Sequence, residues 1–323
     1  MSLVLAPALT DLQPGRSTIT ADVLAGLSQH PKALPSKYFY DAHGSALFEQ
    51  ITHQPEYYPT RTELALLQQV MPDIARAVGP GARVVEYGSG SGRKTRLLLQ
   101  GLSDPVAYTP IEISRAALLA SVTELALELP QVEMLPVCAD FTGPVRLPEP
   151  AQRHDSTLVF FPGSTLGNFT HDESVQLLRA MRQTMGSDGM ALIGIDLHKD
   201  VAVVEAAYND AAGITAAFTL NLLARLNRDV GSDFDLSCFQ HRARYHVPRM
   251  RIETELVSTC EQVVHVDGER FHFAAGEAMQ VEYSHKYTDA SFAALAAAAG
   301  LVVGEGWDSP APEFGLRLLR PST

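Results

Sequence analysis

The sequence that decides the fold is Glu86-Tyr87-Gly88-Ser89-Gly90-Ser91-Gly92-Arg93-Lys94, which ends a short apolar run and opens a helical pattern. Glycines in such a loop let the backbone approach a ligand closely, beside the N–H groups of a helix N-terminus. The NAD-binding fingerprint requires a third glycine at the position of Arg93, and a phosphate-binding P-loop requires a Gly-Lys-Ser/Thr ending that this loop lacks. The loop therefore indicates a cofactor site of another kind.

Short apolar runs alternate with helical patterns from this loop onward. Strands that alternate with helices form βαβ units and a parallel, doubly wound sheet. A helix at 290–299 and strands near 301–306 and 314–319 can close this sheet, with the last strand antiparallel. The expected fold class is α/β, with a Rossmann-like central domain. Its expected strands are 83–87, 107–111, 133–138, 156–161 and 190–196, and the helices between them are 94–102, 114–128 and 172–185.

The alternation stops after Asp196. Residues 199–230 have helical spacing, and residues 242–283 have the pattern of antiparallel strands with a turn at Asp267-Gly268. The simplest arrangement joins two separate stretches of chain into each of two domains. It places a Rossmann-like domain at 60–197 and 286–323, and a smaller α+β domain at 1–59 and 198–285.

A helix start is indicated just before the first strand of the central domain. Thr60 and Glu63 have the Ser/Thr-x-x-Glu spacing of a capping box and precede an apolar-periodic run. We therefore expect a helix over about 61–78, with Thr60 and Glu63 closing its first turn.

Composition and charge exclude several classes of protein. Apolar residues make up 46% and charged residues 19% of the 323 residues, which is typical of a chain that buries a core. The 25 basic and 37 acidic residues give a net charge of −12, so nucleic acid is not an expected partner. The longest apolar stretch, at 292–303, is shorter than the roughly 18 residues that span a bilayer, so no membrane segment is expected.

The cysteines are few and widely spaced. Cys138, Cys238 and Cys260 are odd in number and never form Cys-x-x-Cys, which argues against a disulfide framework and a thiolate zinc site. No histidine pattern implies a metal. We expect a monomer of the reducing cytoplasm, without a signal peptide, that acts on a small molecule.

Acidic side chains are expected at the ends of three successive strands. Glu86 ends the first strand, and Glu112 ends the second, where it can accept two ribose hydroxyls. Asp140 ends the third, where it can accept from an adenine amine beside Phe141. Either of the last two acids alone could be a helix cap or a solvated loop residue, but together the three resemble the S-adenosylmethionine site of class I methyltransferases. The candidate cofactor-binding residues are Glu86, Gly88, Ser89, Gly90, Lys94, Glu112, Asp140 and Phe141.

Six collinear motifs extend over about 250 residues of the chain. They are Lys37-Tyr38-Phe39-Tyr40-Asp41, Glu56-Tyr57-Tyr58-Pro59-Thr60-Arg61, Gly88-Ser89-Gly90 with Lys94-Thr95-Arg96, Gly163-Ser164-Thr165-Leu166-Gly167-Asn168, Ala207-Tyr208-Asn209-Asp210-Ala211-Ala212-Gly213 and Glu282-Tyr283-Ser284-His285-Lys286-Tyr287. Together they resemble the motifs of one family, the histidine-specific Nα-methyltransferases of ergothioneine biosynthesis. The resemblance implies a methyltransferase domain and a second domain built from the N-terminal segment and a late insertion.

The same resemblance implies roles for individual residues. Tyr57 and Glu282 would bind an imidazole with support from Ser284, and Glu282 is suited to this because a carboxylate accepts an imidazole N–H. The carboxylate of the substrate would meet neutral donors, and aromatic rings could face a methylammonium group by cation–π attraction. Asn168 and Tyr208 would bind that carboxylate, and Tyr40 and Gly163 would lie near the amine and the methyl path. The candidate substrate-binding residues are Tyr57, Phe48, Asn168, Tyr208, Thr254, Glu282 and Ser284; the candidate catalytic residues are Tyr40, Asn168 and Gly163.

Other interpretations of these residues stay open at this point. Tyr57 and Tyr208 could be ordinary half-buried tyrosines. Glu282 and Ser284 lie two apart on a strand and so share a face, which is usually a solvent face. The family commonly has a methionine where this chain has Thr254, and a smaller polar residue would enlarge or hydrate the pocket there.

The expected reaction is in-line attack of a neutral amine on the sulfonium methyl group of S-adenosylmethionine, with S-adenosylhomocysteine as product. Catalysis would consist mainly of positioning, with Tyr40 on the proton path. Repeated transfer to L-histidine would give trimethylhistidine, hercynine. The alternatives are an N-methyltransferase acting on another amino acid or an aromatic amine, and a silent module that binds S-adenosylmethionine.

Overall fold

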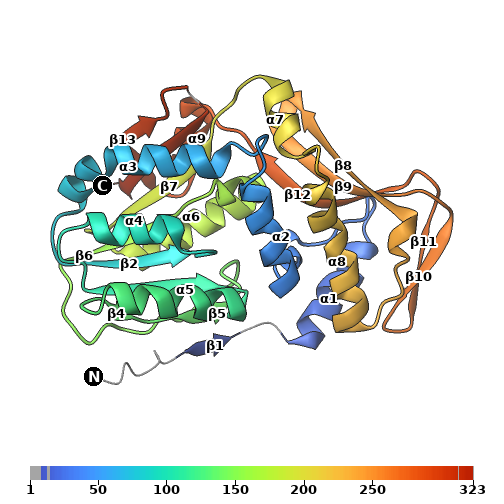
Figure 1. Cartoon of the computed structure of the whole chain (residues 1–323), viewed down its shortest axis with the longest axis horizontal. Helices are drawn as coiled ribbons and strands as arrows, with labels where there is room; N and C mark the ends of the chain where they lie inside the picture. The colour runs from blue at the N-terminus through green and yellow to red at the C-terminus, as the bar shows by residue number, and fades with distance from the viewer. Residues whose placement is uncertain (1–8, 13–14, 312, 323) are drawn as a thin grey trace. The chain divides into compact units, whose positions relative to one another are not determined.

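In the computed structural model, residues 9–12, 15–311 and 313–322 are described, and the chain forms two compact units (Figure 1). The larger unit takes in the described parts of Met1–Gln13, Pro59–His198 and Lys286–Thr323. The smaller unit takes in those of Pro14–Tyr58 and Lys199–His285. Among the described residues, no helix is both long and apolar enough to cross a membrane.

The larger unit contains a mostly parallel sheet in the order β1-β5-β3-β2-β6-β7-β14-β13, with β4 paired to β3 (Figure 1). The strands from β1 to β7 run parallel, whereas β14 is antiparallel to both β7 and β13. The doubly wound α/β fold with an antiparallel last strand is therefore confirmed. The strands are β1 (Thr10–Leu12), β2 (Ala82–Tyr87), β3 (Ala107–Glu112), β4 (Glu133–Met134), β5 (Val137–Ala139), β6 (Ser156–Phe161), β7 (Met190–Asp196), β13 (Leu301–Asp308) and β14 (Phe314–Pro321).

Two expectations about this sheet are wrong. Residues 10–12, expected in the smaller domain, form β1 and pair in parallel with β5. The strand expected at 133–138 is two short strands, β4 and β5, interrupted at Leu135-Pro136. Proline has no N–H to donate to a neighbouring strand, which accounts for the interruption.

Helices pack on both faces of the sheet. Successive residues of a strand point to opposite faces, and here the residues on both faces are apolar and need to be covered. Val84 packs in a core cluster with α3, α4 and α5, whereas Val85 packs in a second cluster with α6 and α9. These two layers leave the carboxyl ends of the parallel strands free to carry loops. The helices are α3 (Pro59–Val78), α4 (Arg93–Gly101), α5 (Arg115–Glu128), α6 (His171–Met185) and α9 (Asp289–Ala298), with a 3-10 turn η2 (Thr165–Asn168) after β6.

The smaller unit combines helices with antiparallel strands around its own core (Figure 1). A three-stranded sheet has the order β12-β9-β8, and a separate hairpin pairs β10 with β11 through a turn at Asp267-Gly268. Both turn residues have positive φ, 50° and 84°, as a tight hairpin requires. The elements are α1 (Arg16–Leu27), η1 (Ser36–Phe39), α2 (Ala42–Thr52), α7 (Val201–Ala207), α8 (Ile214–Val230), η3 (Leu236–Cys238), β8 (Phe239–His246), η4 (Val247–Arg249), β9 (Arg251–Ser258), β10 (Gln262–Val266), β11 (Glu269–Phe273) and β12 (Ala278–His285).

Candidate active site

The glycine-rich loop joins β2 to α4 as expected. Gly88, Gly90 and Gly92 all have positive φ, between 51° and 74°, a conformation that glycine adopts without steric cost. A Cβ atom at Gly90 would meet nothing within 4 Å, whereas one at Gly88 would lie 3.5 Å from the Phe141 ring. The Ser89 hydroxyl is buried and makes no hydrogen bond with the described residues. The loop thus offers open space and an unused polar group to a ligand.

Glu112 connects the end of β3 to this loop. Its carboxylate accepts hydrogen bonds from the Gly90 N–H at 3.1 Å and the Ser114 N–H at 2.9 Å. Burial raises the pKa of Glu112, while these backbone donors partly oppose the rise. The structure therefore places this strand-end acid directly against the glycine loop.

Glu86 lies deeper, at the end of β2, and is fully buried. Its Oε2 accepts hydrogen bonds from the Thr95 hydroxyl at 2.6 Å and from the Tyr108 hydroxyl. Burial raises the pKa of Glu86 to about 8, against the effect of these two donors. Glu86 thus links β2 to β3 and α4 from inside the protein, and its contact with a cofactor stays a prediction.

Asp140 and Phe141 follow β5, the neighbour of β3 in the sheet. Asp140 accepts from the N–H and the hydroxyl of Thr142 at 2.9 and 2.6 Å. The Phe141 ring packs edge-on against the rings of Tyr87 and Phe161, each with centroids 5.8 Å away. Since β5, β3 and β2 are adjacent and parallel, the three acids lie at one edge of the sheet, where such folds bind ligands.

Glu63 belongs to this region, and the capping-box prediction is wrong. Thr60 is already the second residue of α3, and Glu63 is fully buried. Both Glu63 oxygens accept from the Gly163 N–H at 3.0 Å, and Lys94 Nζ lies 2.5 Å from Oε2. A Cβ at Gly194 would lie 2.5 Å from Glu63 Oε1, so only glycine fits beside this carboxylate.

The sequence contains a signal for this burial. Glu63 precedes Leu66, Leu67 and Val70 by three, four and seven positions, so it shares their buried helix face. Thr60 lies about one helical turn before Glu63 inside α3, so the pair has the spacing of a capping box without forming one.

The loop after β6 has a strained backbone. Gly163 has φ 80°, and Ser164 adopts φ 55° although it is not a glycine. The Ser164 hydroxyl accepts from the Asp196 N–H at 2.8 Å, and the Asp196 carboxylate pairs with the fully buried Lys286 at 2.7 Å. These contacts fix the start of η2, whose last residue is the half-buried Asn168.

Three candidate aromatic residues gather in the smaller unit. The Phe48 ring lies 5.7 Å from the Tyr40 ring and 6.2 Å from the Tyr57 ring, both edge-on, and all three side chains are half-buried. Phe218 of α8 packs against Tyr40 and Phe48, with ring centroids 5.6 and 5.9 Å away. The structure therefore brings together residues that are far apart in the sequence.

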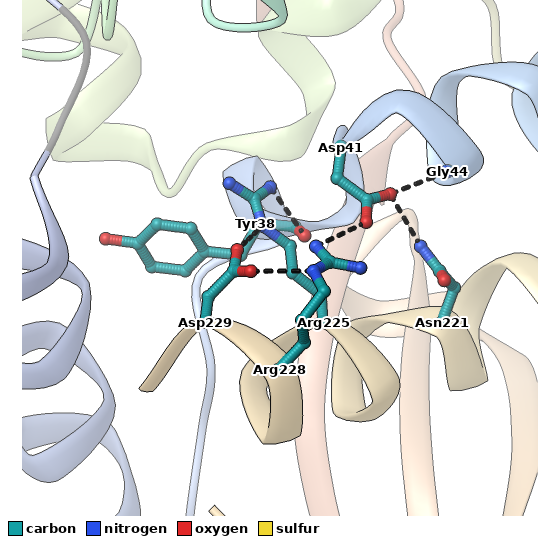
Figure 2. Close-up of polar contacts among 7 residues, drawn as sticks. All are labelled: Tyr38, Asp41, Gly44, Asn221, Arg225, Arg228 and Asp229. Atoms are coloured by element: carbon teal, nitrogen blue, oxygen red, sulfur yellow. Dashed lines mark hydrogen bonds and ion pairs between the residues drawn. The ribbon is translucent and has the colours of Figure 1, made fainter. Parts of the chain in front are cut away.

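A polar network holds the backbone around Tyr40 (Figure 2). Asp41 caps α2 by accepting from the Gly44 N–H at 2.7 Å, and it also accepts from Asn221 at 2.9 Å and Arg228 at 2.8 Å. Burial alone would raise the pKa of Asp41, but these donors together hold it below its usual value. Pattern reasoning missed this network because its partners are up to 187 residues apart.

Arg225 completes the network from α8 (Figure 2). It donates to the Tyr38 carbonyl at 3.0 Å and pairs with Asp229 at 3.1 Å. The turn that carries Tyr40 is thus held from both sides by side chains of one helix.

The remaining candidates lie on or beside the sheet of the smaller unit. Thr254 on β9 stands opposite Glu282 on β12, next to a β-bulge between Gln280 and Glu282. Gln280 closes the bulge by donating to the carbonyls of Thr254 at 3.0 Å and Glu282 at 2.5 Å. Thr254 is 2% exposed, and its hydroxyl has no hydrogen-bond partner among the described residues.

Tyr208, which directly follows α7, contacts Ser284 of β12. The Tyr208 hydroxyl donates to the Ser284 hydroxyl at 2.6 Å, and Ser284 is buried, so the solvent-face interpretation is wrong for it. His241, which sequence reasoning missed, contacts the Tyr208 carbonyl at 2.9 Å and the Thr219 hydroxyl at 3.0 Å. Burial lowers the pKa of His241, which favours the neutral ring as a support for Tyr208.

Among the described residues, no group of three or more His, Cys, Asp or Glu side chains could hold a metal ion. The polar groups that the structure does assemble are carboxylates and hydroxyls at the strand ends of the larger unit. They suit a neutral or cationic organic ligand with hydroxyl and amine donors.

Comparison with known proteins agrees with this chemistry. Residues 19–321 match the family model described as histidine-specific methyltransferase, SAM-dependent. A histidine N-alpha-methyltransferase of Mycolicibacterium smegmatis is 41% identical over 303 residues, which cover 92% of this chain and 93% of that protein. An ergothioneine biosynthesis protein of Neurospora crassa is 28% identical over 311 residues, or 90% of this chain and 33% of that protein.

A solved structure supports the fold. An S-adenosylmethionine-dependent methyltransferase from Clostridium acetobutylicum aligns with a TM-score of 0.50 over 85% of this chain and 98% of that one, at 10% identity. The glycine loop, the strand-end acids and the family match lead to one assignment. This chain belongs to the family of histidine-specific, S-adenosylmethionine-dependent methyltransferases.

Proposed function

We propose that this chain transfers methyl groups from S-adenosylmethionine to the α-amine of L-histidine, forms hercynine by three successive transfers, and so begins ergothioneine biosynthesis. The relatives' names support the substrate and the pathway. The observation that carries the proposal is the polar set on β9 and β12, where Glu282 faces Thr254 and Ser284 bonds Tyr208. We further propose that the protein works as a cytoplasmic monomer.

For the cofactor, we propose that the groups at the sheet edge bind its adenosyl part. Glu112 would accept the ribose hydroxyls and Asp140 the adenine amine, with Phe141 beside the base. Lys94, which already pairs with Glu63, would attract the carboxylate of the methionyl part. S-adenosylmethionine supplies an electrophilic methyl group, and the remaining steps depend on how the chain holds the amine.

For the substrate, Glu282 would accept the imidazole N–H, with Tyr57 and Ser284 in support. A carboxylate can offset the cost of removing the ring from water, because charge-assisted hydrogen bonds are stronger than neutral ones. Tyr208 and Asn168 would donate to the substrate carboxylate without adding a buried charge. For this, Tyr208 would turn its one hydroxyl hydrogen from Ser284 to the substrate, and the Ser284 hydroxyl would then donate to the Tyr208 oxygen. Asn168 and Gly163 enter this proposal through the family resemblance alone.

For the reaction, the amine must be neutral before it attacks. A cationic sulfonium nearby and partial burial both lower the pKa of an ammonium group, which favours release of its proton. Tyr40 would take part in that release, and the Asp41 network keeps its backbone in place. The ring of Phe48 would face the methylated ammonium by cation–π attraction.

The test is mass spectrometry of an equimolar mixture of the common amino acids, incubated with the purified chain and S-adenosylmethionine. We expect mono-, di- and trimethylated histidine, with the trimethylated form accumulating. Methylation of another amino acid would overturn the substrate and keep the mechanism. No methylation at all would overturn the function and favour a silent module that binds the cofactor.

A second candidate function is N-methylation of another amino acid or an aromatic amine. The observation that favours it is Thr254, whose buried hydroxyl has no partner among the described residues and stands opposite Glu282. A ligand with a hydrogen-bonding group at this point would satisfy Thr254. Measuring kcat/KM for histidine, for other amino acids and for aromatic amines separates the two functions. The higher value for histidine would favour the first function, and the higher value for another amine would favour the second.

A further inference from the structure

Two cysteine thiols lie side by side in the smaller unit. Cys238 ends η3 just before β8, and Cys260 lies in the turn between β9 and β10. Their Sγ atoms are 2.8 Å apart, and both residues are free and partly exposed. Because 22 positions separate them in the chain, only the fold brings them together.

The backbone holds both cysteines in place. Phe239 and Ser258 form the pair nearest to them in the β8–β9 ladder, and the Thr259 N–H donates to the Cys238 carbonyl at 2.8 Å. The Ser258 hydroxyl donates to the Cys260 carbonyl, also at 2.8 Å. The two thiols therefore face each other because the ladder and its turn are fixed.

We propose that Cys238 and Cys260 form a redox modification site that closes to an intramolecular disulfide in the presence of a low-molecular-weight disulfide, such as oxidised glutathione. One bond forms between the two Sγ atoms, and the glutathione disulfide bond breaks. The protein thiols lose two electrons and two protons, and two molecules of reduced glutathione leave. None of the residues assigned to methyl transfer takes part.

Both exchanges depend on ionisation of a thiol. The neighbouring Cys260 thiol, partial burial and the Asp235 carboxylate raise the pKa of Cys238 to about 11. Thiolates rather than thiols attack disulfides, so closure should be faster as the pH rises. One thiol attacks the glutathione disulfide, and the other, 2.8 Å away, resolves the mixed disulfide.

The bridge would close the segment that contains β8, η4 and β9. A bond between two residues 22 positions apart reduces the conformational freedom of the unfolded chain. The oxidised protein should therefore unfold at a temperature about 5 °C higher. Because β9 is the central strand of its sheet, hydrogen exchange of amides near the β8–β9 end should slow as well.

The experiment treats the full chain with oxidised glutathione, traps remaining thiols with iodoacetamide and maps the peptides. We expect a peptide pair linked through Cys238 and Cys260, a mass lower by two hydrogen atoms, and reversal by dithiothreitol. Cys138 is an internal control, because its thiol is buried and should stay reduced.

Single variants make the test decisive. C238S and C260S should each lose the linked peptide and the rise in unfolding temperature, and C238S should retain glutathione on Cys260. If the wild type forms only mixed disulfides, or if Cys138 reacts equally, the proposal is wrong. Methyl transfer assayed on the same samples reports on the proposed function separately.

Discussion

The acidic side chains at the carboxyl edge of the large sheet are held by the protein itself, whereas the Thr254 hydroxyl in the smaller unit has no partner among the described residues. Glu63, Glu86 and Glu112 each accept at least two hydrogen bonds or ion pairs, so their geometry is set before a ligand binds. Changes in the first region should therefore affect folding, and changes in the second should mainly affect which ligand binds.

The largest expected loss of stability from a single substitution is at Glu63. Replacing it with alanine leaves Lys94 without its buried partner and the Gly163 N–H without an acceptor, so we expect a loss of about 3 kcal/mol in the free energy of unfolding. Glu63→Gln keeps an acceptor for Gly163 and should lose less. Urea denaturation of both variants measures the difference, and wild-type stability of Glu63→Ala would show that the contact contributes nothing.

A crossed pair of substitutions compares the two regions directly. Glu282→Ala should weaken histidine binding by about 30-fold, or about 2 kcal/mol, and leave S-adenosylmethionine binding nearly unchanged, since a charge-assisted hydrogen bond is lost. Glu112→Ala should weaken S-adenosylmethionine binding and leave histidine binding nearly unchanged. Titration calorimetry with each ligand measures both effects.

The crossed pair can also contradict each assignment separately. If Glu282→Ala lowers the affinities for histidine and S-adenosylmethionine equally, Glu282 does not bind the imidazole specifically. Unchanged cofactor affinity in Glu112→Ala would remove the ribose assignment at the end of β3.

A pH dependence follows from Glu86. Burial raises its pKa in the folded chain to about 8, while the unfolded chain releases this proton near 4.5. The folded state therefore binds the proton more tightly, and the free energy of unfolding should fall as pH rises from about 4.5 to 8, by about 1 kcal/mol per unit. Glu86→Gln, which cannot titrate, should remove this slope. Parallel slopes for variant and wild type would show that Glu86 is ionised in the folded chain.

Much of the larger unit could be predicted from the sequence, because strand and helix periods and the glycine loop are local patterns. The strand expected at 133–138 is interrupted at Pro136, which lacks an N–H. Pattern reasoning overlooked this proline because it stands within an apolar run. The burial of Glu63 was missed because its spacing from Thr60 fits a capping box, while its spacing from the apolar residues that follow fits a buried helix face. Its partner Gly163 lies 100 positions away, which no local pattern reports.

The smaller unit was harder to predict because its candidate site depends on strand register. Ser284 is buried although alternation on β12 favours a solvent face, and the bulge beside Glu282 shifts the pairing. Asp41, Arg225 and His241 were missed because their contacts join distant segments. The family resemblance named the residues, but only the fold shows what supports them.

The smallest effect, and the one that most sharpens the comparison, is expected at Thr254. Thr254→Val keeps the shape of the side chain and removes a buried hydroxyl that has no partner, so stability without ligand should rise, by about 1 kcal/mol at most. If the substrate satisfies this hydroxyl, the same variant should raise its KM about fivefold with little change in kcat, because one neutral hydrogen bond is lost. Thermal unfolding and steady-state kinetics on one preparation test both effects. A more stable variant with unchanged KM would mean that the substrate does not reach β9 at this position, and Thr254 would then lose its place in the substrate site.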